Sequence, residues 1–445
     1  MLSKHYYRFF FALASCLLVL LLAACDTTPV TNNPTPTSTT PAGTTATTPA
    51  GKMPGVTPTT IPTTAPVPPT QTGCPANDTA RAAVMAPLAP GNHASIIYSV
   101  NQFQAQNHVP TTGALKRYDT VTGNKSVIVT LPGSIDSAQV SADGQWILLV
   151  SSSANIPDPQ KLQLIRVDGQ GLQTLFCGLI PNPQWTTDEK HIAFTTTSNS
   201  QDSVDIIDVT NGTLAKYLTT STFANGVVVR FWLDNTRIYV TSIPVDQPPD
   251  TLYLLDTSKG TGQKLSDLTT IVSHKFFGDF DSSYDGARLF VNYGFCGQGG
   301  CIPPGLITVQ PATGGTQTTI LNSPQYDTTA VRAVTAKTLL VVINNTQIVN
   351  TNADQSHNGL WEMNTDGSGL KRLTTDAAHQ GSALNNFSQY PWSNVSRDGS
   401  MYALQQYGGN SNVSLLYGSL NSGNPTSFAS IADGTQLSIV GWTTM

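Results

Sequence analysis

Residues 359–374 read Gly-Leu-Trp-Glu-Met-Asn-Thr-Asp-Gly-Ser-Gly-Leu-Lys-Arg-Leu-Thr, a pattern of two short strands joined by a tight turn. Strand-forming side chains occupy 360–363 and return at 370–373. Asp366 and Gly367 supply the reversal, because glycine reaches positive φ at little steric cost. The stretch predicts an antiparallel hairpin, and degenerate copies of it occur along most of the chain.

The first strand of this hairpin recurs at regular intervals. Equivalent strands end at Asp119, Arg166, Asp208, Asp256, Gln310, Asn364 and Ser419, with 42 to 55 residues between successive ends. A second hairpin precedes most copies, as in residues 185–194, Trp-Thr-Thr-Asp-Glu-Lys-His-Ile-Ala-Phe. Four-stranded units at this period are typical of β-propellers, and seven copies predict seven blades.

The two ends of the repeat region complement each other. Residues 94–99 match the second strand of a unit whose first strand is missing, and residues 437–443 match that missing strand. Pairing the two would remove the exposed edges of an open ring. We therefore expect an all-β fold over residues 94–445: a seven-bladed β-propeller of four-stranded antiparallel blades, closed by the C-terminal strand.

The repeat also resembles that of a known family. The pattern Trp-Ser-Pro-Asp-Gly-x-x-Ile-Ala-Phe, then Leu-Trp-x-x-Asp-x-x-Gly and Arg-Leu-Thr, is similar to the TolB-type (WD40-like, PD40) propeller repeat, most clearly at residues 185–194 and 360–374. The resemblance implies the fold far more than a function. TolB-type propellers act with a peptidoglycan-associated lipoprotein, whereas this chain has a lipid-anchor signal of its own.

The amino terminus has the features of an export signal. Lys4 and Arg8 give a positive start, and residues 9–22 form an apolar run too short for an ordinary membrane span. Residues 22–25, Leu-Ala-Ala-Cys, match a bacterial lipobox. We expect residues 1–24 to be a lipoprotein signal peptide and Cys25 to carry the lipid, which places the protein outside the cytoplasm, anchored to the bacterial cell membrane. The alternative is an ordinary export signal in which Cys25 is incidental.

A long threonine- and proline-rich segment follows the anchor. Residues 26–73 contain 18 Thr and 11 Pro among 48 residues, with Asp26 and Lys52 as the charged side chains. So much proline excludes helix and most sheet. Residues 25–73 are therefore expected to form a disordered tether, which at ~3.1 Å per residue reaches on the order of 100 Å.

Composition limits the classes of partner. Removing residues 1–24 lowers the formal charge from −5 to −7, and no basic cluster is present. This argues against nucleic acid as a partner. We expect a monomer that contacts the membrane through its lipid.

Four cysteines remain beyond the signal peptide and the anchor: Cys74, Cys177, Cys296 and Cys301. Outside the cytoplasm an even number predicts disulfides. Residues 296–301, Cys-Gly-Gln-Gly-Gly-Cys, favour a local bridge, which would leave Cys74 to pair with Cys177. A zinc site is the alternative, although the paired Cys-x-x-Cys spacing of such sites is missing.

Residues 74–93 form a lead-in between the tether and the propeller. Within it, residues 78–86 have the alanine-rich pattern of a short helix, with Asp78 as its N-cap. We expect this helix to pack on the propeller.

The connections predict which face of the ring is available for binding. In an up-and-down meander, the turns between first and second strands and between third and fourth strands share one face, and both are short here. The opposite face receives the longer connections, and function tends to reside in such loops on a rigid scaffold. The candidate binding residues in these loops are His108, Tyr293, Phe295, His357 and Tyr407.

Motifs for catalysis and metal binding are weak. The sequence has no Gly-x-Ser-x-Gly, His-Glu-x-x-His or Gly-Lys-Ser/Thr pattern. Asp279, Asp281 and Asp285 partly match a calcium loop, but Tyr284 and Phe290 stand where an EF-hand needs glycine and glutamate. We expect no cofactor, with calcium at this loop as the one weak candidate.

Three functions stay open at this point. The first is a non-catalytic binding or scaffold protein that presents its long-loop face to an envelope protein or polysaccharide. The second is a propeller-type carbohydrate-active enzyme, a lyase or hydrolase, with carboxylates from different blades at the channel mouth. The third is a small-ligand or metal sensor.

Overall fold

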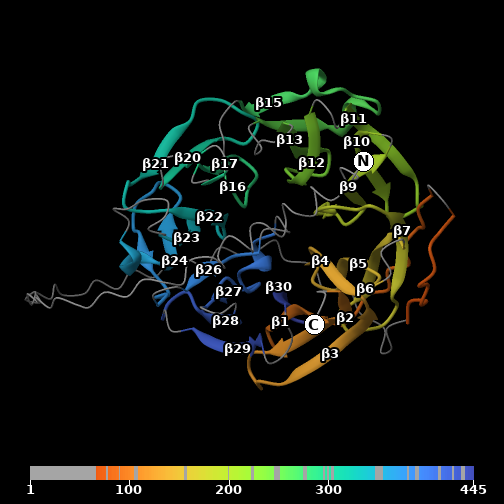
Figure 1. Ribbon diagram of the computed structural model, residues 1–445, viewed down its shortest axis with the longest axis horizontal. Helices are drawn as coiled ribbons and strands as arrows, with labels where there is room; N and C mark the ends of the chain where they lie inside the picture. The colour runs from red at the N-terminus through yellow and green to blue at the C-terminus, as the bar shows by residue number, and fades with distance from the viewer. Residues whose placement is uncertain are drawn as a thin grey trace, which may run out of the picture. The chain divides into compact units, whose positions relative to one another are not determined.

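The computed structural model describes residues 67–445, apart from 77–78, 90, 105–108, 155–157, 199, 222–224, 245–250, 274–277, 294–295, 298–299, 302–304, 346–353, 378–379, 386–389, 409–411, 423–424 and 432–435. This part of the chain forms seven four-stranded antiparallel sheets and one two-stranded sheet. The seven sheets stand side by side in a ring around a central axis (Figure 1). The predicted seven-bladed propeller is confirmed.

Each blade is a meander that runs from the axis outward. Blades 1 to 4 consist of β30 (Gln436–Thr443), β1 (Ser95–Phe103), β2 (Pro110–Asp119) and β3 (Lys125–Pro132); β4 (Ser134–Val140), β5 (Trp146–Ser152), β6 (Gln160–Arg166) and β7 (Gln173–Gly178); β8 (Gln184–Trp185), β9 (His191–Ser198), β10 (Gln201–Asp208) and β11 (Leu214–Ser221); and β12 (Asn225–Trp232), β13 (Arg237–Pro244), β14 (Thr251–Asp256) and β15 (Thr269–Val272).

Blades 5 to 7 continue the same arrangement. They consist of β16 (Asp279–Ser282), β17 (Arg288–Asn292), β20 (Leu306–Pro311) and β21 (Thr318–Asn322); β22 (Thr328–Ala333), β23 (Thr338–Ile343), β24 (Gly359–Asn364) and β25 (Lys371–Arg372); and β26 (Gly381–Ala383), β27 (Met401–Tyr407), β28 (Val413–Ser419) and β29 (Thr426–Ser430). Short 3₁₀ turns lie between strands at η2 (Thr257–Lys259), η3 (Leu265–Asp267), η4 (Gln355–His357) and η5 (Pro391–Ser393).

The ring is closed by the C-terminal strand, as the ends of the repeat region predict. β30 pairs with β1 from Ser95 opposite Thr443 to Asn101 opposite Gln436. Blade 1 therefore joins the first and last strands of the propeller, and no inner edge of β1 is left unpaired. Trp442 of β30 is fully buried.

The short turns follow from local side-chain hydrogen bonds. In the β4–β5 turn, the Asp143 carboxylate accepts from the Gln145 backbone N–H at 2.9 Å and from the Ser141 hydroxyl at 2.6 Å. Gly144 has a φ of +80°, a conformation that glycine adopts without strain. Asp366 and Gly367 of the opening hairpin form the same kind of turn, with Gly367 at a φ of +89°.

Apolar packing between neighbouring blades forms the core. One cluster joins Trp146 and Leu164 of blade 2 to Trp185 and Phe194 of blade 3. Trp232 packs in the equivalent cluster between blades 3 and 4. These repeat tryptophans therefore serve packing between blades.

The lead-in is an extended strap and not a helix. Residues 79–89 have no regular secondary structure, so the predicted helix over 78–86 is wrong; Asp78 itself lies outside the described residues. Backbone groups of the strap bond to the blades instead: Arg81 N–H donates to Leu175 at 2.9 Å, and Ala83 N–H donates to Val209 at 2.8 Å. These hydrogen bonds to other segments replace the ones that a helix would make within itself.

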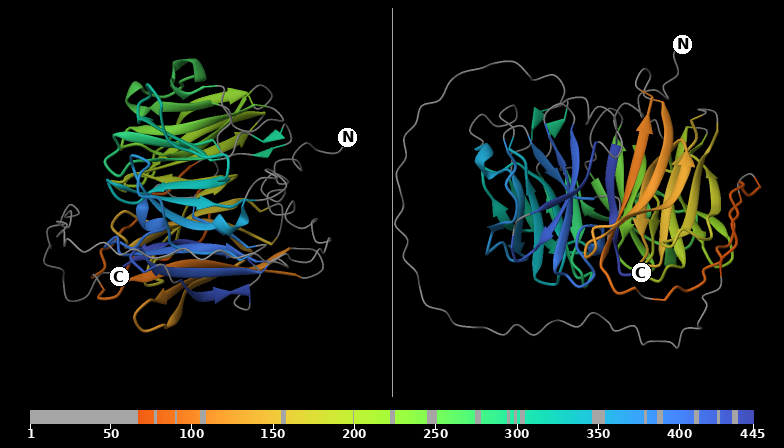
Figure 2. Two further views of the ribbon diagram at one scale, coloured as in Figure 1. Left: turned by 90° about the vertical axis from the view of Figure 1, so that its left-hand side faces the viewer. Right: turned by 90° about the horizontal axis from the view of Figure 1, so that it is seen from below.

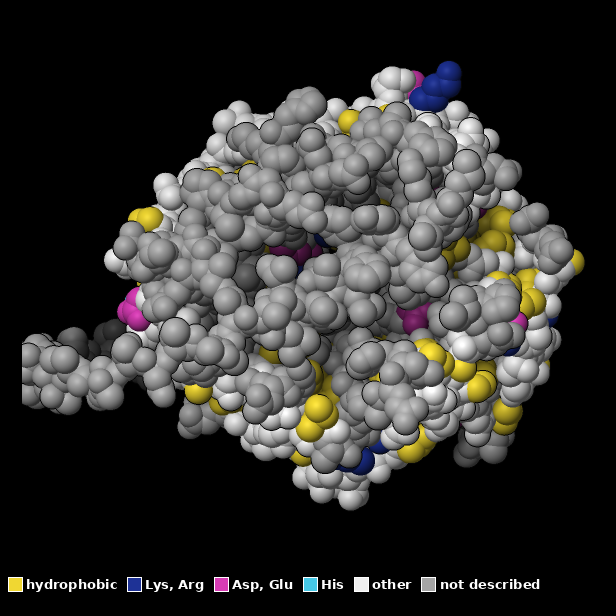
Figure 3. Space-filling model, viewed as in Figure 1, with side chains coloured by type: hydrophobic (Ala, Val, Ile, Leu, Met, Phe, Trp, Pro, Cys, Tyr) yellow, Lys and Arg dark blue, Asp and Glu magenta, His cyan; other side chains and the backbone are white. Residues whose placement is uncertain are grey.

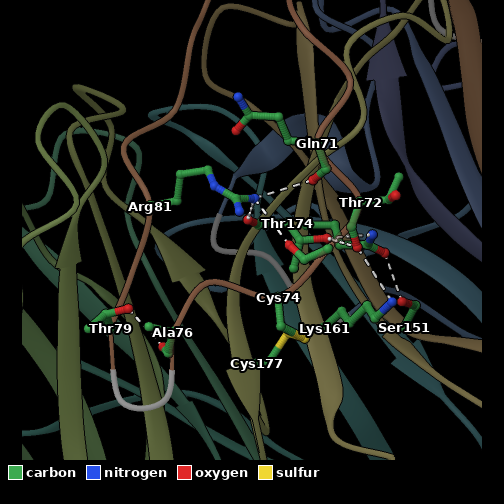
Figure 4. The surroundings of a disulfide bond; sticks show 12 residues. Gln71, Thr72, Cys74, Ala76, Thr79, Arg81, Ser151, Lys161, Thr174 and Cys177 are labelled. Atoms are coloured by element: carbon green, nitrogen blue, oxygen red, sulfur yellow. Dashed lines mark hydrogen bonds between the residues drawn. A yellow bond between two sulfur atoms is a disulfide. The ribbon is translucent and has the colours of Figure 1, made fainter.

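A disulfide fixes the strap to the ring (Figure 4). Cys74 and Cys177 are bonded, with a Cα–Cα distance of 5.8 Å and 103 residues between them in sequence. Arg81 lies close by and donates to the carbonyls of Gly73 at 3.2 Å and Thr174 at 2.7 Å. Gln71 also pairs with β7, so residues that the sequence assigns to the tether contact blade 2.

The second predicted disulfide stays a prediction. Cys296 lies opposite Cys301 in the hairpin of β18 (Cys296–Gly297) and β19 (Gly300–Cys301). This backbone register places the two residues as neighbours, while their side chains lie outside the described residues.

The connections separate onto two faces of the ring (Figure 2). Turns such as β4–β5 and β6–β7 lie on one face, which we call the short-turn face. The strand ends joined by the connections β1–β2, β5–β6, β13–β14, β17–β20, β23–β24 and β27–β28 lie at the other, the long-loop face. None of the helical turns in the described part of the chain has the length and hydropathy of a membrane span.

Candidate functional site

The inner strands of the seven blades surround the ring axis, and we call the space that they enclose the channel. Each inner strand is paired on one side only, so its backbone N–H groups on the other side need acceptors. Side chains of the preceding blade supply several of them. Asn101 accepts from Ile135 N–H at 2.9 Å, and Thr195 accepts from Val229 N–H at 3.0 Å.

Between blades 5 and 6, charged side chains accept hydrogen bonds from the backbone N–H groups of the inner strand. Asp279 of β16 accepts from Val331 N–H of β22 at 3.0 Å and forms an ion pair with Arg332, and both of these charged side chains are buried. The Arg332 guanidinium also donates to the Asn385 carbonyl at 3.2 Å. Arg332 therefore joins the inner strands of blades 5 and 6 to blade 7.

Asp281 lies two residues further along β16 and is also buried. Its carboxylate accepts from the backbone N–H groups of Ala333 and Ser282, each at 2.9 Å. Burial raises the pKa of Asp281 to about 7, although the positive charge of Arg332 and the two hydrogen bonds oppose this shift. On the same strand, Asp279 thus has Arg332 as its ion-pair partner, whereas the hydrogen bonds to Asp281 come from backbone N–H groups.

Arg230 adds a second guanidinium to this group. The register of β12 against β13 shifts between Val229 and Phe231, so Arg230 is the extra residue of a β-bulge. Its guanidinium carbon lies 5.3 Å from the centre of the Phe280 ring in the next blade. We call Arg230, Asp279, Asp281 and Arg332 the channel charge cluster; it spans the inner strands of three consecutive blades.

One end of the channel is crossed by an aromatic segment of blade 7. The inner strand of this blade is interrupted after β26, and the break is held together by Asn385 and Asn394, which exchange backbone-to-side-chain hydrogen bonds of 2.7 and 3.1 Å. Within the interruption, Tyr390 stacks on Trp392 with ring centres 4.5 Å apart. The Arg397 guanidinium covers Trp392 at 4.5 Å.

These three side chains, Tyr390, Trp392 and Arg397, form what we call the aromatic brace. The Tyr390 hydroxyl donates to the Trp185 carbonyl of blade 3 at 2.8 Å, and the Trp392 indole N–H donates to the Val140 carbonyl of blade 2 at 3.4 Å. Val140 and Trp185 are the last residues of their inner strands, directly before turns of the short-turn face. The brace therefore spans the channel at that face.

The channel charge cluster lies on inner strands that run from the long-loop face to the short-turn face. Arg230, Asp281 and Arg332 lie within two residues of the short-turn ends of β12, β16 and β22. Figure 3 views the long-loop face, and acidic side chains are visible in a hollow near its centre. The channel thus has charged groups on its inner strands and an aromatic brace at its short-turn end.

The candidate binding residues do not converge on one site. His108 and Phe295 lie outside the described residues. Tyr293 is buried in the cluster between blades 4 and 5, and its hydroxyl accepts a hydrogen bond from Gln317 at 2.8 Å, so it is a packing residue. Tyr407 is 40% exposed at the end of β27.

His357 belongs to an aromatic group at the edge of blade 6. Its ring centre lies 5.2 Å from that of Tyr326 and 6.2 Å from that of Trp361. Arg372 covers the Trp361 ring at 5.7 Å and donates to the Thr374 carbonyl at 2.8 Å. The rings of Tyr326, His357 and Trp361 therefore pack together beside Arg372, where η4 leads into β24.

The weak calcium candidate is not assembled. Asp279 pairs with Arg332, whereas Asp285 accepts hydrogen bonds within its own turn, from Ser283 and from Ala287 N–H at 3.1 Å. Among the described residues, no group of three His, Cys, Asp or Glu side chains could hold a metal ion.

Sequence reasoning missed the channel charge cluster and the brace. A basic residue inside an apolar strand, as in Val-Val-Val-Arg-Phe-Trp at residues 227–232, was the one local signal for Arg230. Arg332 and Tyr390 meet partners 53 and 205 residues away in sequence, which no local pattern encodes.

Comparisons with known proteins agree with the fold. No family model matches the chain, and no curated protein matches its sequence. The propeller domain of the Trilobed protease from Pyrococcus furiosus is similar in structure, with a TM-score of 0.51, 9% identity and coverage of 77% of this chain and 98% of that one. A periplasmic gluconolactonase, PpgL, from Pseudomonas aeruginosa has a TM-score of 0.50 at 12% identity, covering 78% and 99%.

TolB from Acinetobacter baumannii is also among the similar structures. Its TM-score is 0.39 at 16% identity, and the match covers 61% of this chain and 62% of that one. At these identities the comparisons establish the propeller fold and leave function to the site itself.

Proposed function

We propose that the protein is a non-catalytic binding protein of the cell envelope. In this proposal Cys25 carries a lipid, the part of the tether before Gln71 holds the propeller away from the membrane outside the cytoplasm, and the long-loop face recognises an envelope protein or polymer. The observation that carries the proposal is the aromatic brace, which spans the short-turn end of the channel and leaves the long-loop mouth as the approach to the charge cluster.

The hydrogen bonds of the carboxylates favour binding over catalysis. Asp279 and Asp281 each accept a backbone N–H from the inner strand of the next blade, and Asp279 is also paired with Arg332. Carboxylates that satisfy a neighbouring strand are held in place by the fold and are less available to a substrate. The same hydrogen bonds make the channel wall rigid, which suits a preformed binding surface.

Photo-crosslinking on intact cells tests the choice of face, and the chain offers a matched pair of positions. Tyr407 on the long-loop face and Tyr284 on the short-turn face are 40% and 46% exposed. We expect a photoreactive amino acid at position 407 to trap an envelope component and the same group at position 284 to trap much less. Equal trapping, or trapping only from position 284, would contradict the proposal.

A carbohydrate-active enzyme is the second candidate, and the pair on β16 is the observation that favours it. Residues two apart on a strand are separated by about 6.6 Å, within the ~5–9.5 Å range of glycosidase carboxylates. The pKa of Asp281, raised by burial to about 7, would suit a general acid. Hydrolysis or lysis of a polysaccharide panel by the wild type, abolished in Asp281→Asn, would establish this function in place of the first.

A further inference from the structure

The Arg230 guanidinium is a positive charge without a matching acceptor. Among the residues that the structure describes, none accepts a hydrogen bond from it or forms an ion pair with it, and its neighbour is the face of Phe280 at 5.3 Å. Arg332, the other guanidinium of the cluster, has an ion pair and carbonyl acceptors. An arginine that is partly withdrawn from water and lacks such partners is costly to retain for packing alone.

The backbone presents Arg230 in a way that ordinary strand residues do not share. Val229 packs in the cluster between blades 3 and 4, and Phe231 packs in the cluster between blades 4 and 5. The bulge places Arg230 between these two packed residues without a ladder partner. Bulges occur often beside binding and active sites, where they redirect a side chain.

From these observations we infer that Arg230 binds the carboxylate group of a ligand that enters the channel from the long-loop face. The inference rests on the proposed function for the direction of entry. The planar guanidinium matches a carboxylate through two parallel N–H donors. The Phe280 ring below it holds the fork in place by a cation–π contact.

The surrounding charges favour a carboxylate over a phosphate. Asp279 and Asp281 lie on the neighbouring inner strand and Arg332 on the next one. Burial lowers the pKa of Arg230, the negative charge of Asp279 opposes this shift, and the positive charge of Arg332 adds to it. A single negative charge balances the one unpaired guanidinium. A phosphate dianion would add a second negative charge beside two carboxyl groups, which is unfavourable at these short distances.

The aromatic brace limits how a ligand can reach Arg230. Because Tyr390 and Trp392 bond to Trp185 and Val140, the brace obstructs the short-turn end of the channel beside blades 2 and 3. This favours a small molecule or the end of a chain as the source of the carboxylate. A sugar acid carries such a carboxylate. The corresponding neutral sugar has nearly the same shape without the charge.

Isothermal titration of the full chain with D-glucuronate, D-glucose and inorganic phosphate tests the inference. We expect D-glucuronate to bind more tightly than either of the other two. Arg230→Gln should weaken D-glucuronate binding about tenfold or more, because a charge-assisted hydrogen bond is lost. Arg230→Lys keeps the charge without the fork and should give an intermediate affinity.

Arg237→Gln is the matched control, because Arg237 lies in the same blade and pairs with Asp234 in the β12–β13 turn on the short-turn face. It should bind D-glucuronate as the wild type does. Equal binding by the wild type and Arg230→Gln, no binding of D-glucuronate, or tighter binding of phosphate would overturn the inference. If these failures occurred while position 407 still trapped an envelope component, the carboxylate site would be wrong and the long-loop face would stand.

Discussion

Asp281 connects the burial of one side chain to the pH dependence of the whole protein. Burial raises its pKa to about 7 in the folded state, against ~3.9 in an unfolded chain. Between these two values the folded protein holds a proton that the unfolded chain has released. The contribution of Asp281 to stability is therefore lost as pH rises from about 4 to about 7.

Asp281→Asn removes this dependence, because an amide does not titrate and its oxygen can still accept from Ala333 N–H. We expect the variant to exceed the wild type in free energy of unfolding by on the order of 4 kcal/mol near pH 8, with little difference near pH 4. Urea unfolding at both pH values measures the difference. Asp327 and Glu189, with pKa values raised by burial to about 6 and about 8, titrate in both proteins and cancel in the comparison. A difference that does not change with pH would contradict the prediction.

The two guanidinium groups of the channel charge cluster predict opposite effects on stability. Arg332→Met leaves Asp279 buried without its cation and should lower the free energy of unfolding by about 3–5 kcal/mol. Arg230→Met removes a cation that has no ion pair among the described residues, so stability should stay constant or rise by about 1 kcal/mol. Chemical denaturation of both variants tests this. A large loss of stability in Arg230→Met would show that Arg230 is a structural residue.

At the scale of elements, hairpins were predictable and the departures from the repeat were not. The Asp-Gly turns depend on residues two or three positions apart, as in Asp143 and Gln145, so a short sequence window contains their cause. The strap at residues 79–89 has helix-forming alanines, but its backbone groups bond to Leu175 and Val209 of other blades. Such tertiary hydrogen bonds override local propensity.

The candidate site was less predictable than the fold for the same reason. Tyr293 has the sequence position of a loop residue, yet it packs between two blades. Arg230 and Arg332 lie on the inner strands of different blades, which come together around the axis only when the ring is formed. Polar residues on the inner strands were visible in the sequence, but their shared position around the axis was not.

The aromatic brace predicts local coupling between blades 7 and 2. Trp392→Ala removes the stack with Tyr390, the contact with Arg397 and the hydrogen bond to Val140. We expect a loss of about 2–4 kcal/mol in stability and faster hydrogen exchange in the β4–β5 turn, measured by mass spectrometry.

Trp361→Ala is the control for the brace, because Trp361 is a partly buried tryptophan of blade 6 with an arginine over its ring. It should lower stability without changing exchange in the β4–β5 turn. Unchanged exchange in that turn in both variants would mean that the brace does not hold blade 2.

At the scale of the molecule, one covalent bond holds the strap to the ring. The 103-residue separation of Cys74 and Cys177 predicts a contribution of about 4–5 kcal/mol in the chain-entropy description. Cys74→Ser, Cys177→Ser and the double variant should therefore lose similar stability in thermal unfolding. Limited proteolysis should then cut within residues 67–93 first, while the ring stays intact. Early cleavage inside the blades would show that the strap is needed for the ring to remain closed.

Closure of blade 1 by β30 also has a consequence for biogenesis. The strand that pairs with β1 is made of residues 436–443, so it is synthesised after all the other strands of the ring. Until then β1 carries an unpaired inner edge, which is a template for association with other chains. The ring therefore closes only after residue 443 has been made, and a chain truncated before residue 436 keeps an open edge that favours aggregation and proteolysis.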